Sequence, residues 1–213
     1  MTKDSLIQNE FSIRPAEETD ASFAGRTLFD SFPRKATYIL GLGDVKRAKG
    51  AIEKLFPLPD HRLSVTHTHI AKYKGRSVGI MIAFPGSEIG RLNWKFYQLI
   101  LSQYGLRGKI ALIKRGLPLV FFKETARDEY FLSNIVVKQQ MRGLGLGSSM
   151  LAFVEEQARQ AGYKKVSLRV AIDNLAAKRF YQRHHYQTKT IDLESNQRVA
   201  MFGPGYQSMV KVL

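Results

Sequence analysis

The sequence predicts an α/β fold built on a mixed sheet that is flanked by helices. Two observations lead to this prediction. In the first half of the chain, two runs rich in β-branched and aromatic residues lie close together, as the strands of a hairpin do. In the second half, similar runs alternate with segments that have the apolar spacing of helices. The length of 213 residues suits one hydrophobic core, so we expect a single domain over residues 1–213.

The first half of the chain is expected to begin with a short strand and a group of helices. Phe11–Arg14 has a strand pattern, and the segment PAEETDA after it predicts a helix start capped by Thr19 or Asp20. Over residues 33–59, glycines and prolines interrupt a helical pattern, which predicts several short helices. The segment VTHTHIAKYKGRSVGIMIAFPG then places two strand-like runs on either side of Lys74-Gly75-Arg76, which predicts a β-hairpin.

Residues 86–127 are expected to form a basic, helical insertion. Between Ile89 and Lys123 the sequence contains no Asp or Glu, and Lys and Arg residues stand among large apolar ones. The apolar residues that fit one face of a helix are Leu92, Phe96, Leu99 and Ile100.

The second half of the chain is predicted to alternate strands and helices. A strand at Tyr130–Val137 leads to a glycine-rich segment, and the apolar stripe after it predicts a helix that ends at Gly162. The segment KKVSLRV alternates apolar and polar residues as a half-buried strand does, and Asp173 or Asn174 would cap a helix that runs through Tyr181. The segments YQTKTIDL and YQSMVKVL predict two closing strands.

Composition limits the chemistry that this chain can perform. It contains no cysteine, which excludes disulfides, thiolate metal sites and cysteine nucleophiles. The first residues lack the apolar run of a signal peptide, and no apolar stretch approaches the ~18 residues of a membrane span. We therefore expect a cytoplasmic protein. The formal net charge of +15 suits a nucleic-acid or membrane partner or a polyanionic small ligand, but a solubilising surface gives the same charge.

The segment RGLGLGSSML, which starts at Arg142, is typical of a loop that binds an anion. Its glycines do not fit the G-x-G-x-x-G pattern of dinucleotide folds, and it lacks the Gly-Lys-Ser/Thr ending of NTPase loops. It does fit a third pattern, R/Q-x-x-G-x-G/A, through Arg142, Gly145 and Gly147. Small residues allow backbone N–H groups to approach a pyrophosphate, and the helix N-terminus adds partial positive charge. Taken alone, the loop is equally compatible with a tight turn that binds nothing.

A second motif makes the interpretation more specific. The segment DNLAAKRFYQRHHY follows about one strand later, and Asn174 and Tyr181 are two helical turns apart, so both can face one cleft. Together with the glycine loop, this segment resembles the GNAT superfamily of acyl-CoA-dependent N-acyltransferases. The resemblance is strongest over residues 130–186. It implies the GNAT fold, in which the mixed sheet is mostly antiparallel.

The resemblance also implies roles for individual residues in binding acetyl-CoA. The strand before the loop splays from its neighbour in this family, and its backbone would bond the pantetheine arm at Ile135, Val136 and Val137. Asn174 would bond the pantetheine or the acyl region, and Tyr181 would protonate the departing CoA thiolate. The pyrophosphate would rest on the backbone amides of Arg142, Gly143, Leu144, Gly145, Leu146, Gly147 and Ser148.

The reaction that the resemblance implies is direct attack of an amine on the thioester, with a backbone amide near Val137 stabilising the oxyanion. The amine must lose a proton, and the family often places a carboxylate on the strand before the loop. The nearest candidate here is Glu129 at the start of that strand, with His67 and His69 as alternatives. No metal is expected, because the adjacent histidines 184 and 185 point apart and lack a third ligand.

Two features depart from the family's pattern. Where the family has Gly-Phe after the tyrosine helix, this chain has His185-Tyr186. The insertion at residues 86–127 replaces a brief connection between two strands and is expected near the acceptor side of the cleft. It would act as a packed cap, or its charge would attract an acidic acceptor, a membrane surface or nucleic acid.

The predicted function is therefore that of an N-acetyltransferase that transfers an acetyl group from acetyl-CoA to a primary amine of a small molecule or peptide. The alternative is a basic module of the same fold that binds CoA, nucleic acid or a membrane surface with little or no turnover. Asn174 and Tyr181 favour the enzyme, because binding nucleic acid requires neither. The scarcity of acidic residues disfavours a polycationic acceptor such as a polyamine. The acceptor, the acyl length and the oligomeric state are not specified by the sequence.

Overall fold

The structure, a computed structural model, describes residues 10–120, 124–195, 199 and 202–213. Its centre is a seven-stranded sheet with the strand order β1-β2-β3-β4-β5-β7-β6. β4 and β5 run parallel, and the other neighbouring strands are antiparallel, which confirms the predicted mixed, mostly antiparallel sheet. The strands are β1 (Phe11–Pro15), β2 (Thr68–Tyr73), β3 (Arg76–Pro85), β4 (Tyr130–Val137), β5 (Lys165–Ala171), β6 (Gln187–Leu193) and β7 (Gly205–Val212).

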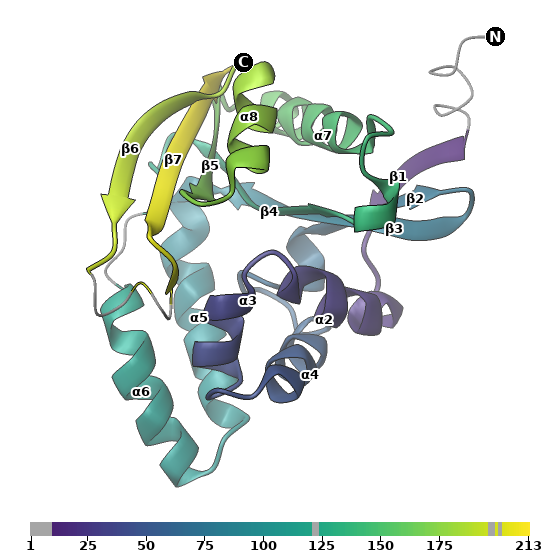
Figure 1. The fold of residues 1–213 in the computed structure, drawn as a ribbon. Coiled ribbons are helices and arrows are strands. Elements are labelled where there is room, and N and C mark those ends of the chain that lie inside the picture. Colours follow the sequence, from purple (N-terminus) through teal and green to yellow (C-terminus); the bar gives the residue numbers. More distant parts are fainter. Residues whose placement is uncertain (1–9, 121–123, 196–198, 200–201) are drawn as a thin grey trace, which may run out of the picture.

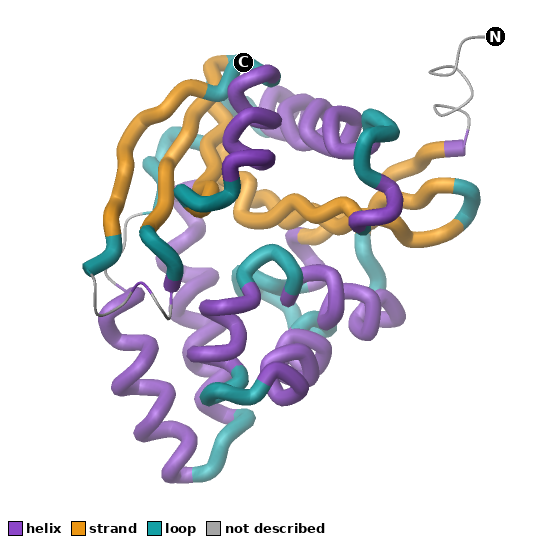
Figure 2. Tube along the Cα trace, in the orientation of Figure 1, coloured by secondary structure: helices purple, strands orange, loops and turns teal. Residues whose placement is uncertain are grey.

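Helices cover both faces of the sheet (Figures 1 and 2). Two of them, α7 and α8, lie on one face, and α2 to α6 lie on the other. A π-helical turn at Ala36–Leu40 continues α3. The α-helices are α2 (Ala21–Phe29), α3 (Pro33–Lys35), α4 (Val45–Leu55), α5 (Ile89–Ser102), α6 (Leu106–Val120), α7 (Leu146–Gln160) and α8 (Leu175–Arg183).

Because both faces of the sheet are covered, buried side chains form two hydrophobic clusters, one on each face, where the length of the chain predicted one core. β3 contributes to both: Ile80, Ile82 and Phe84 pack with α2, α4 and α5, and Met81 packs with α7. Gly79 allows α7 to approach β3 closely, because a Cβ atom there would stand 2.9 Å from the sulfur of Met150. The central strands are therefore buried on both sides, as covered sheets require.

The start of α2 differs in detail from the predicted cap. Asp20 does precede the helix, but its side chain makes no capping hydrogen bond to α2. Its carboxylate instead accepts two hydrogen bonds from the guanidinium of Arg14, at 2.7 and 2.8 Å, and one from the N–H of Glu17 at 2.8 Å. The nearby guanidinium on β1 competes successfully for the carboxylate, so Asp20 joins β1 to the helix entry.

The predicted helical insertion is present as α5 and α6, which form an antiparallel pair on the side of the sheet away from α7 (Figure 1). The apolar face of α5 is buried at Leu92, Phe96 and Ile100, as its spacing predicted. Within the described parts of the chain, no helix combines the length and the apolar character needed to cross a membrane.

The contact between β4 and β5 is short and positions the candidate site. These strands pair only from Tyr130–Leu132 to Val166–Leu168. The register of β4 against β3 shifts directly afterwards, so that Ser133 is an extra residue, a β-bulge. Beyond the bulge, β4 and β5 separate, and the edge of β4 that faces β5 has no strand partner among the described residues.

Candidate active site

The glycine-rich loop joins β4 to α7 and depends on glycine at two positions. Gly143 has a φ of 83° and Gly145 a φ of 75°, in the left-handed region that residues with a side chain adopt at a cost. Gly145 is the N-cap of α7. Gly147 lies in the first turn of the helix, and a Cβ atom there would make only ordinary contact with Phe180, at 3.6 Å.

The loop presents backbone donors at the start of α7. In the described part of the chain, no backbone carbonyl accepts from the N–H groups of residues 143–147. The N-terminus of a fifteen-residue helix adds partial positive charge at the same place. Arg142 folds back over the end of β4, where its Nε donates to the carbonyl of Val137 at 3.4 Å. This arrangement suits a bound pyrophosphate.

The open edge of β4 continues from this loop toward the bulge. Ile135, Val136 and Val137 pair with β3 on one side through Met81, Ile80 and Gly79. Their other side faces the gap that opens where β5 diverges. An extended ligand arm can therefore bond the backbone there without displacing a strand.

Tyr181 lies on α8 and is buried with the side chains of α7 and the neighbouring strands. Its side chain is 8% exposed and packs against Phe180 and Tyr186, with ring centroids 5.3 and 5.8 Å away. Burial raises the pKa of Tyr181 above its usual value near 10. The phenol therefore stays protonated at neutral pH and can act as a proton donor.

Asn174 caps α8, as the sequence predicted. Its Oδ1 accepts a hydrogen bond from the N–H of Ala177 at 3.1 Å, and the residue is exposed. The cap uses only the oxygen, so the side-chain NH₂ group is still available as a donor. A structural role and a ligand-binding role are compatible at this position.

The turn after α8 keeps a glycine-like conformation without glycine. His185 has a φ of 66°, and the N–H of Tyr186 donates to the carbonyl of Tyr181 at 3.0 Å. The departure from the family's Gly-Phe pattern therefore changes the residue but not the left-handed turn. The ring of His184, just before it, lies 2.9 Å from the hydroxyl of Ser148 in the loop.

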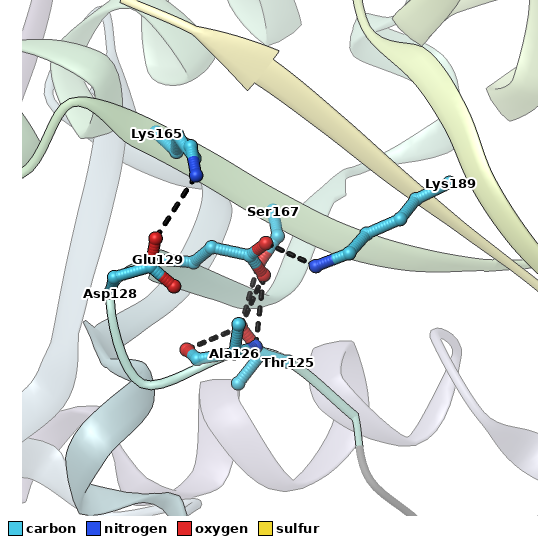
Figure 3. A network of polar contacts seen from close by, with 7 residues as sticks. All are labelled: Thr125, Ala126, Asp128, Glu129, Lys165, Ser167 and Lys189. Atoms are coloured by element: carbon cyan, nitrogen blue, oxygen red, sulfur yellow. Dashed lines mark hydrogen bonds and ion pairs between the residues drawn. The ribbon is translucent and has the colours of Figure 1, made fainter.

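Glu129 lies in a buried polar network (Figure 3). Its carboxylate accepts from the hydroxyl of Thr125 and the N–H of Ala126, both at 3.0 Å, and from the ammonium of Lys189. Burial alone would raise the pKa of Glu129, but these donors and Ser167 outweigh it and lower the pKa. A carboxylate with many donors and a low pKa is a weak base, so this geometry favours a structural role over the predicted catalytic one.

A pocket of about 180 Å³ opens on the other side of the β4 bulge. β4 contributes Ser133 and Asn134, β5 contributes Arg169, and α5 from the insertion contributes Asn93. The insertion therefore contributes to the lining of this pocket. The remaining lining residues are Ser31, Phe32, Lys35, Ala36, Ile39, Leu40, Arg62, Leu63, Phe96, Tyr97, Glu124, Phe131, Glu194 and Tyr206.

Charged side chains of both signs line this pocket. Arg62 donates twice to the carboxylate of Glu124, at 2.7 and 3.0 Å, and Arg169 donates to Asp192 at 2.7 Å. Burial by itself would raise the pKa of Glu124, but Arg62, with help from Lys35 and Arg169, lowers it to about 2. Glu124 is therefore ionised and paired at neutral pH.

Sequence reasoning did not find these pocket residues, because no local pattern marks them. Lys35, Arg62, Glu124 and Arg169 come from four separate segments, and each stands in sequence like an ordinary surface charge. Only the tertiary fold brings them together.

The histidines considered as bases lie away from this pocket. His69 on β2 is within 3.2 Å of the side-chain amide of Gln157 on α7, and His67 packs edge-on against Phe84. Neither lines the pocket. Among the residues that the structure describes, no group of three or more His, Asp or Glu side chains is placed to hold a metal ion.

Comparison with known proteins agrees with this geometry. Residues 56–186, more than half of the chain, match the family model described as the acetyltransferase (GNAT) family. This segment contains the glycine loop, Asn174 and Tyr181. An aminoalkylphosphonate N-acetyltransferase of Salmonella typhimurium (strain LT2) is 43% identical over 56 residues, which are 26% of this chain and 36% of that protein. The match therefore spans only about a third of the relative's length.

Solved structures share the fold over nearly the whole chain. A crystal structure of an N-acetyltransferase from Staphylococcus aureus Mu50 has a TM-score of 0.70 and 20% identity, covering 94% of this chain and 100% of that one. An agmatine N-acetyltransferase has a TM-score of 0.58 and 17% identity, covering 96% of this chain and 100% of that one. A polyamine N-acetyltransferase of Drosophila melanogaster has a TM-score of 0.57 and 16% identity, with coverage of 95% and 100%.

Proposed function

Because the chain belongs to the GNAT acetyltransferase family, we propose that it transfers an acetyl group from acetyl-CoA to the primary amine of a small molecule bound in the pocket beside the β4 bulge. N-acetyltransfer to an amine follows from the family. The donor, its binding residues and the size of the acceptor are the proposal.

One observation carries the proposal: the gap between β4 and β5 connects two chemically different regions. On one side lie the amides of residues 143–147 and the open edge of β4, which suit a phosphate-bearing, extended donor. On the other side lies the pocket lined by Ser133 and Arg169. A donor and an acceptor held in these two places would meet at the bulge.

The residues of the chain divide the work of the reaction. The backbone of residues 135–137 would hold the pantetheine arm, the loop amides would hold the pyrophosphate, and Asn174 would donate from its NH₂ group. Acetyl-CoA supplies a thioester that an uncharged amine attacks directly. The Tyr181 phenol would protonate the leaving sulfur, and a backbone N–H near Val137 would stabilise the negative charge that develops on the carbonyl oxygen.

A small acceptor is favoured over a peptide. The pocket of about 180 Å³ is partly enclosed by α5 and the π-helical turn at residues 36–40, which leaves room for a compact molecule. The relatives named for aminoalkylphosphonate, agmatine and polyamine all act on small amines. A basic module that binds without turnover gains no support from this pocket, whose charges are largely paired inside the protein.

The experiment that tests the proposal measures thiol release from acetyl-CoA with a panel of small primary amines. The variant Tyr181→Phe should lower kcat by about 10²- to 10⁴-fold, because it removes the proton donor but no packing. Its Kd for CoA, measured by calorimetry, should stay unchanged. Because the pKa of Tyr181 lies above 10, wild-type kcat should not decline through loss of this proton below about pH 10.

The matched control is Tyr163→Phe, which removes a hydroxyl beyond the C-terminal end of α7, at the far end of that helix from the loop. It should leave kcat and CoA affinity unaltered. If Tyr181→Phe turns over as fast as the control, Tyr181 has no catalytic role. If the wild-type protein binds no CoA, the proposed donor site is wrong.

A further inference from the structure

We propose that the acceptor carries an anionic group in addition to its amine, and that Lys35 binds this group inside the pocket. The inference rests on the proposed function and specifies its substrate class. It concerns small amino acids, aminophosphonates and related amino anions as opposed to simple alkylamines or polyamines.

Lys35 differs from the other cations of the pocket in its partners. Arg62 is paired with Glu124 and Arg169 with Asp192. Within the described residues, no carboxylate lies at ion-pair distance from the Lys35 ammonium. Its contact is with the face of the Tyr206 ring, 4.0 Å from the ring centroid.

The surroundings of Lys35 make its charge costly without a ligand. Burial lowers the pKa of Lys35 to about 8; Arg169 and Arg62 also lower it, while Glu124 and Glu194 raise it without offsetting the burial. An anion beside the ammonium would compensate the lost hydration and return the pKa toward its ordinary value. The three cations that line the pocket (Lys35, Arg62 and Arg169) outnumber its two carboxylates (Glu124 and Glu194), so an anionic ligand beside Lys35 would balance the charge.

Tyr206 extends the same binding surface. The guanidinium of Arg169 also lies against its ring, 5.1 Å from the centroid, so two cations contact one aromatic side chain. Burial raises the pKa of Tyr206 to about 12, so its hydroxyl remains a hydrogen-bond donor at neutral pH. Lys35 and Tyr206 together offer an anion one charge and one neutral donor.

The carboxylates of the pocket do not provide an equivalent site for a second cation. Two carboxylates line the pocket, Glu124 and Glu194. Both oxygens of Glu124 are held by Arg62, and Glu194 is also engaged by a partner. A diamine would bring a second positive charge toward Lys35, Arg62 and Arg169. Like charges within one small pocket repel each other, so the pocket disfavours polycationic acceptors. The scarcity of acidic residues in the sequence led to the same expectation.

The orientation of the acceptor follows from where Lys35 stands. Lys35 is at the end of α3, whereas Ser133, where the gap between β4 and β5 opens, lines the same pocket from β4. An amino anion with its negative group at Lys35 would direct its amine toward the bulge. Lys35 is thus a specificity residue and takes no part in proton transfer.

The test compares acceptors in pairs that differ only by the anionic group: β-alanine with ethylamine, 2-aminoethylphosphonate with ethylamine, and putrescine as the dicationic arm. For wild-type enzyme, kcat/KM should be about tenfold or more higher for the anionic member of each pair. Lys35→Met should reduce kcat/KM for the anionic acceptors by about ten- to hundredfold, mainly through KM, and should change that for ethylamine less than about threefold.

Two further variants separate charge from folding. Lys35→Arg keeps the charge and should retain most of the preference, while Lys46→Met changes an exposed lysine on α4 and should change nothing. Turnover of ethylamine by Lys35→Met shows that the variant is folded and competent. A wild-type preference for ethylamine or putrescine, or an equal loss for all acceptors in Lys35→Met, would overturn the assignment.

A binding arm keeps this inference separate from the proposed reaction. Calorimetric titration of wild-type protein and Lys35→Met with 2-aminoethylphosphonate in the presence of CoA requires no turnover. Binding that weakens about tenfold or more in the variant supports the anion site even if no acetyl transfer is detected. Equal binding to both proteins contradicts it, even if acetyl transfer is fast.

Discussion

His185 shows how a single residue can satisfy a backbone requirement that its type does not favour. The turn after α8 needs a left-handed residue, and His185 adopts a φ of 66° there. Such a conformation costs a residue with a Cβ atom roughly 1 kcal/mol. The hydrogen bond from Tyr186 to Tyr181 across the turn keeps the chain in place. The turn after α8 therefore requires a left-handed conformation more than it requires glycine, although glycine adopts that conformation at the lowest energy.

Glu129 gives a prediction at the same scale. The variant Glu129→Gln should lower the free energy of unfolding by about 1–3 kcal/mol, because an amide cannot satisfy the donors of Thr125, Ala126 and Lys189 together. Its kcat should stay within about threefold of wild type, since Glu129 does not line the pocket. Urea unfolding and thiol release measure the two effects.

The neighbouring variant Asp128→Asn is the control. It breaks an exposed ion pair with Lys165, 3.0 Å long, and should leave the free energy of unfolding close to that of wild type, because water and salt screen such a pair. A loss of kcat of a hundredfold or more in folded Glu129→Gln that still binds CoA would instead identify Glu129 as the general base, as its sequence position suggested.

At the scale of the element, the loop before α7 distinguishes two glycines that look equivalent in sequence. Gly145→Ala should cost roughly 1 kcal/mol in stability and weaken CoA binding about tenfold, because its φ of 75° strains any side chain and shifts the loop amides. Gly147→Ala should leave the Kd for CoA within about threefold and keep or raise stability, because alanine suits a helix. Calorimetry with CoA and thermal unfolding measure both.

The prediction is tested by comparing the CoA affinities of Gly145→Ala and Gly147→Ala. A Cβ atom at residue 147 meets Phe180 at 3.6 Å, which is ordinary contact. If both substitutions weakened CoA binding equally, the ligand would approach residue 147 as closely as it approaches residue 145, and the first turn of α7 would be part of the phosphate contact.

The elements themselves were largely predictable, because each has a local cause. Tyr130–Val137 is a strand with the predicted bounds, the apolar stripe of α7 is buried, and Gly162 ends that helix with a φ of 80°. The bulge at Ser133 was not predictable. The bulge forms where β4 stays paired with β3 but separates from β5. The sequence of a strand does not specify which strands pair with it, so the bulge could not be predicted from β4 alone.

At the scale of the whole molecule, the ion pair between Arg62 and Glu124 helps to connect the insertion to the rest of the protein. Arg62 follows α4, Glu124 follows α6, and Arg62 also donates to Asn93 on α5 at 3.0 Å. The low pKa of Glu124, about 2, means that its ionised form is stabilised by folding. Its contribution is fully present above the unfolded pKa of about 4.5 and is lost as the pH falls toward 2.

We therefore expect the free energy of unfolding to fall between about pH 5 and pH 2. The variant Glu124→Gln should be about 1–3 kcal/mol less stable at pH 7, because Arg62 keeps its partly buried charge without a partner of opposite charge. Its deficit relative to wild type should shrink across that pH range. Urea unfolding at a series of pH values measures this, with Glu53→Gln, an exposed carboxylate on α4, as control.

A deficit that stays constant with pH would mean that the ionisation of Glu124 contributes nothing to folding. The pH dependence of wild-type stability would then have to come from other carboxylates with lowered pKa values, such as Asp20 and Glu129.

The two halves of the site differ in how far the sequence could predict them. The proposed donor half lies between residues 135 and 181 as continuous motifs, because a glycine loop and a helix cap are local structures. The pocket proposed for the acceptor is lined by residues of α3, the turn at residues 36–40, α5, β4, β5 and β7 and by the segments after α2, α4, α6 and β6. Its chemistry depends on long-range packing, so single residues such as Lys35 carry no sequence signal.

The three-residue pairing between β4 and β5 has a mechanical consequence for the molecule. It makes the sheet two half-sheets, β1 to β4 and β5 to β7, hinged along the shortest ladder in the protein. Protection of backbone amides from hydrogen exchange should be lost first at the β4–β5 boundary, because few backbone hydrogen bonds cross it. A ligand bound in the gap would form hydrogen bonds with the open edge of β4 and so connect the two half-sheets. The sheet would then be more rigid with ligand than without it, and the ligand would be released when the half-sheets move apart.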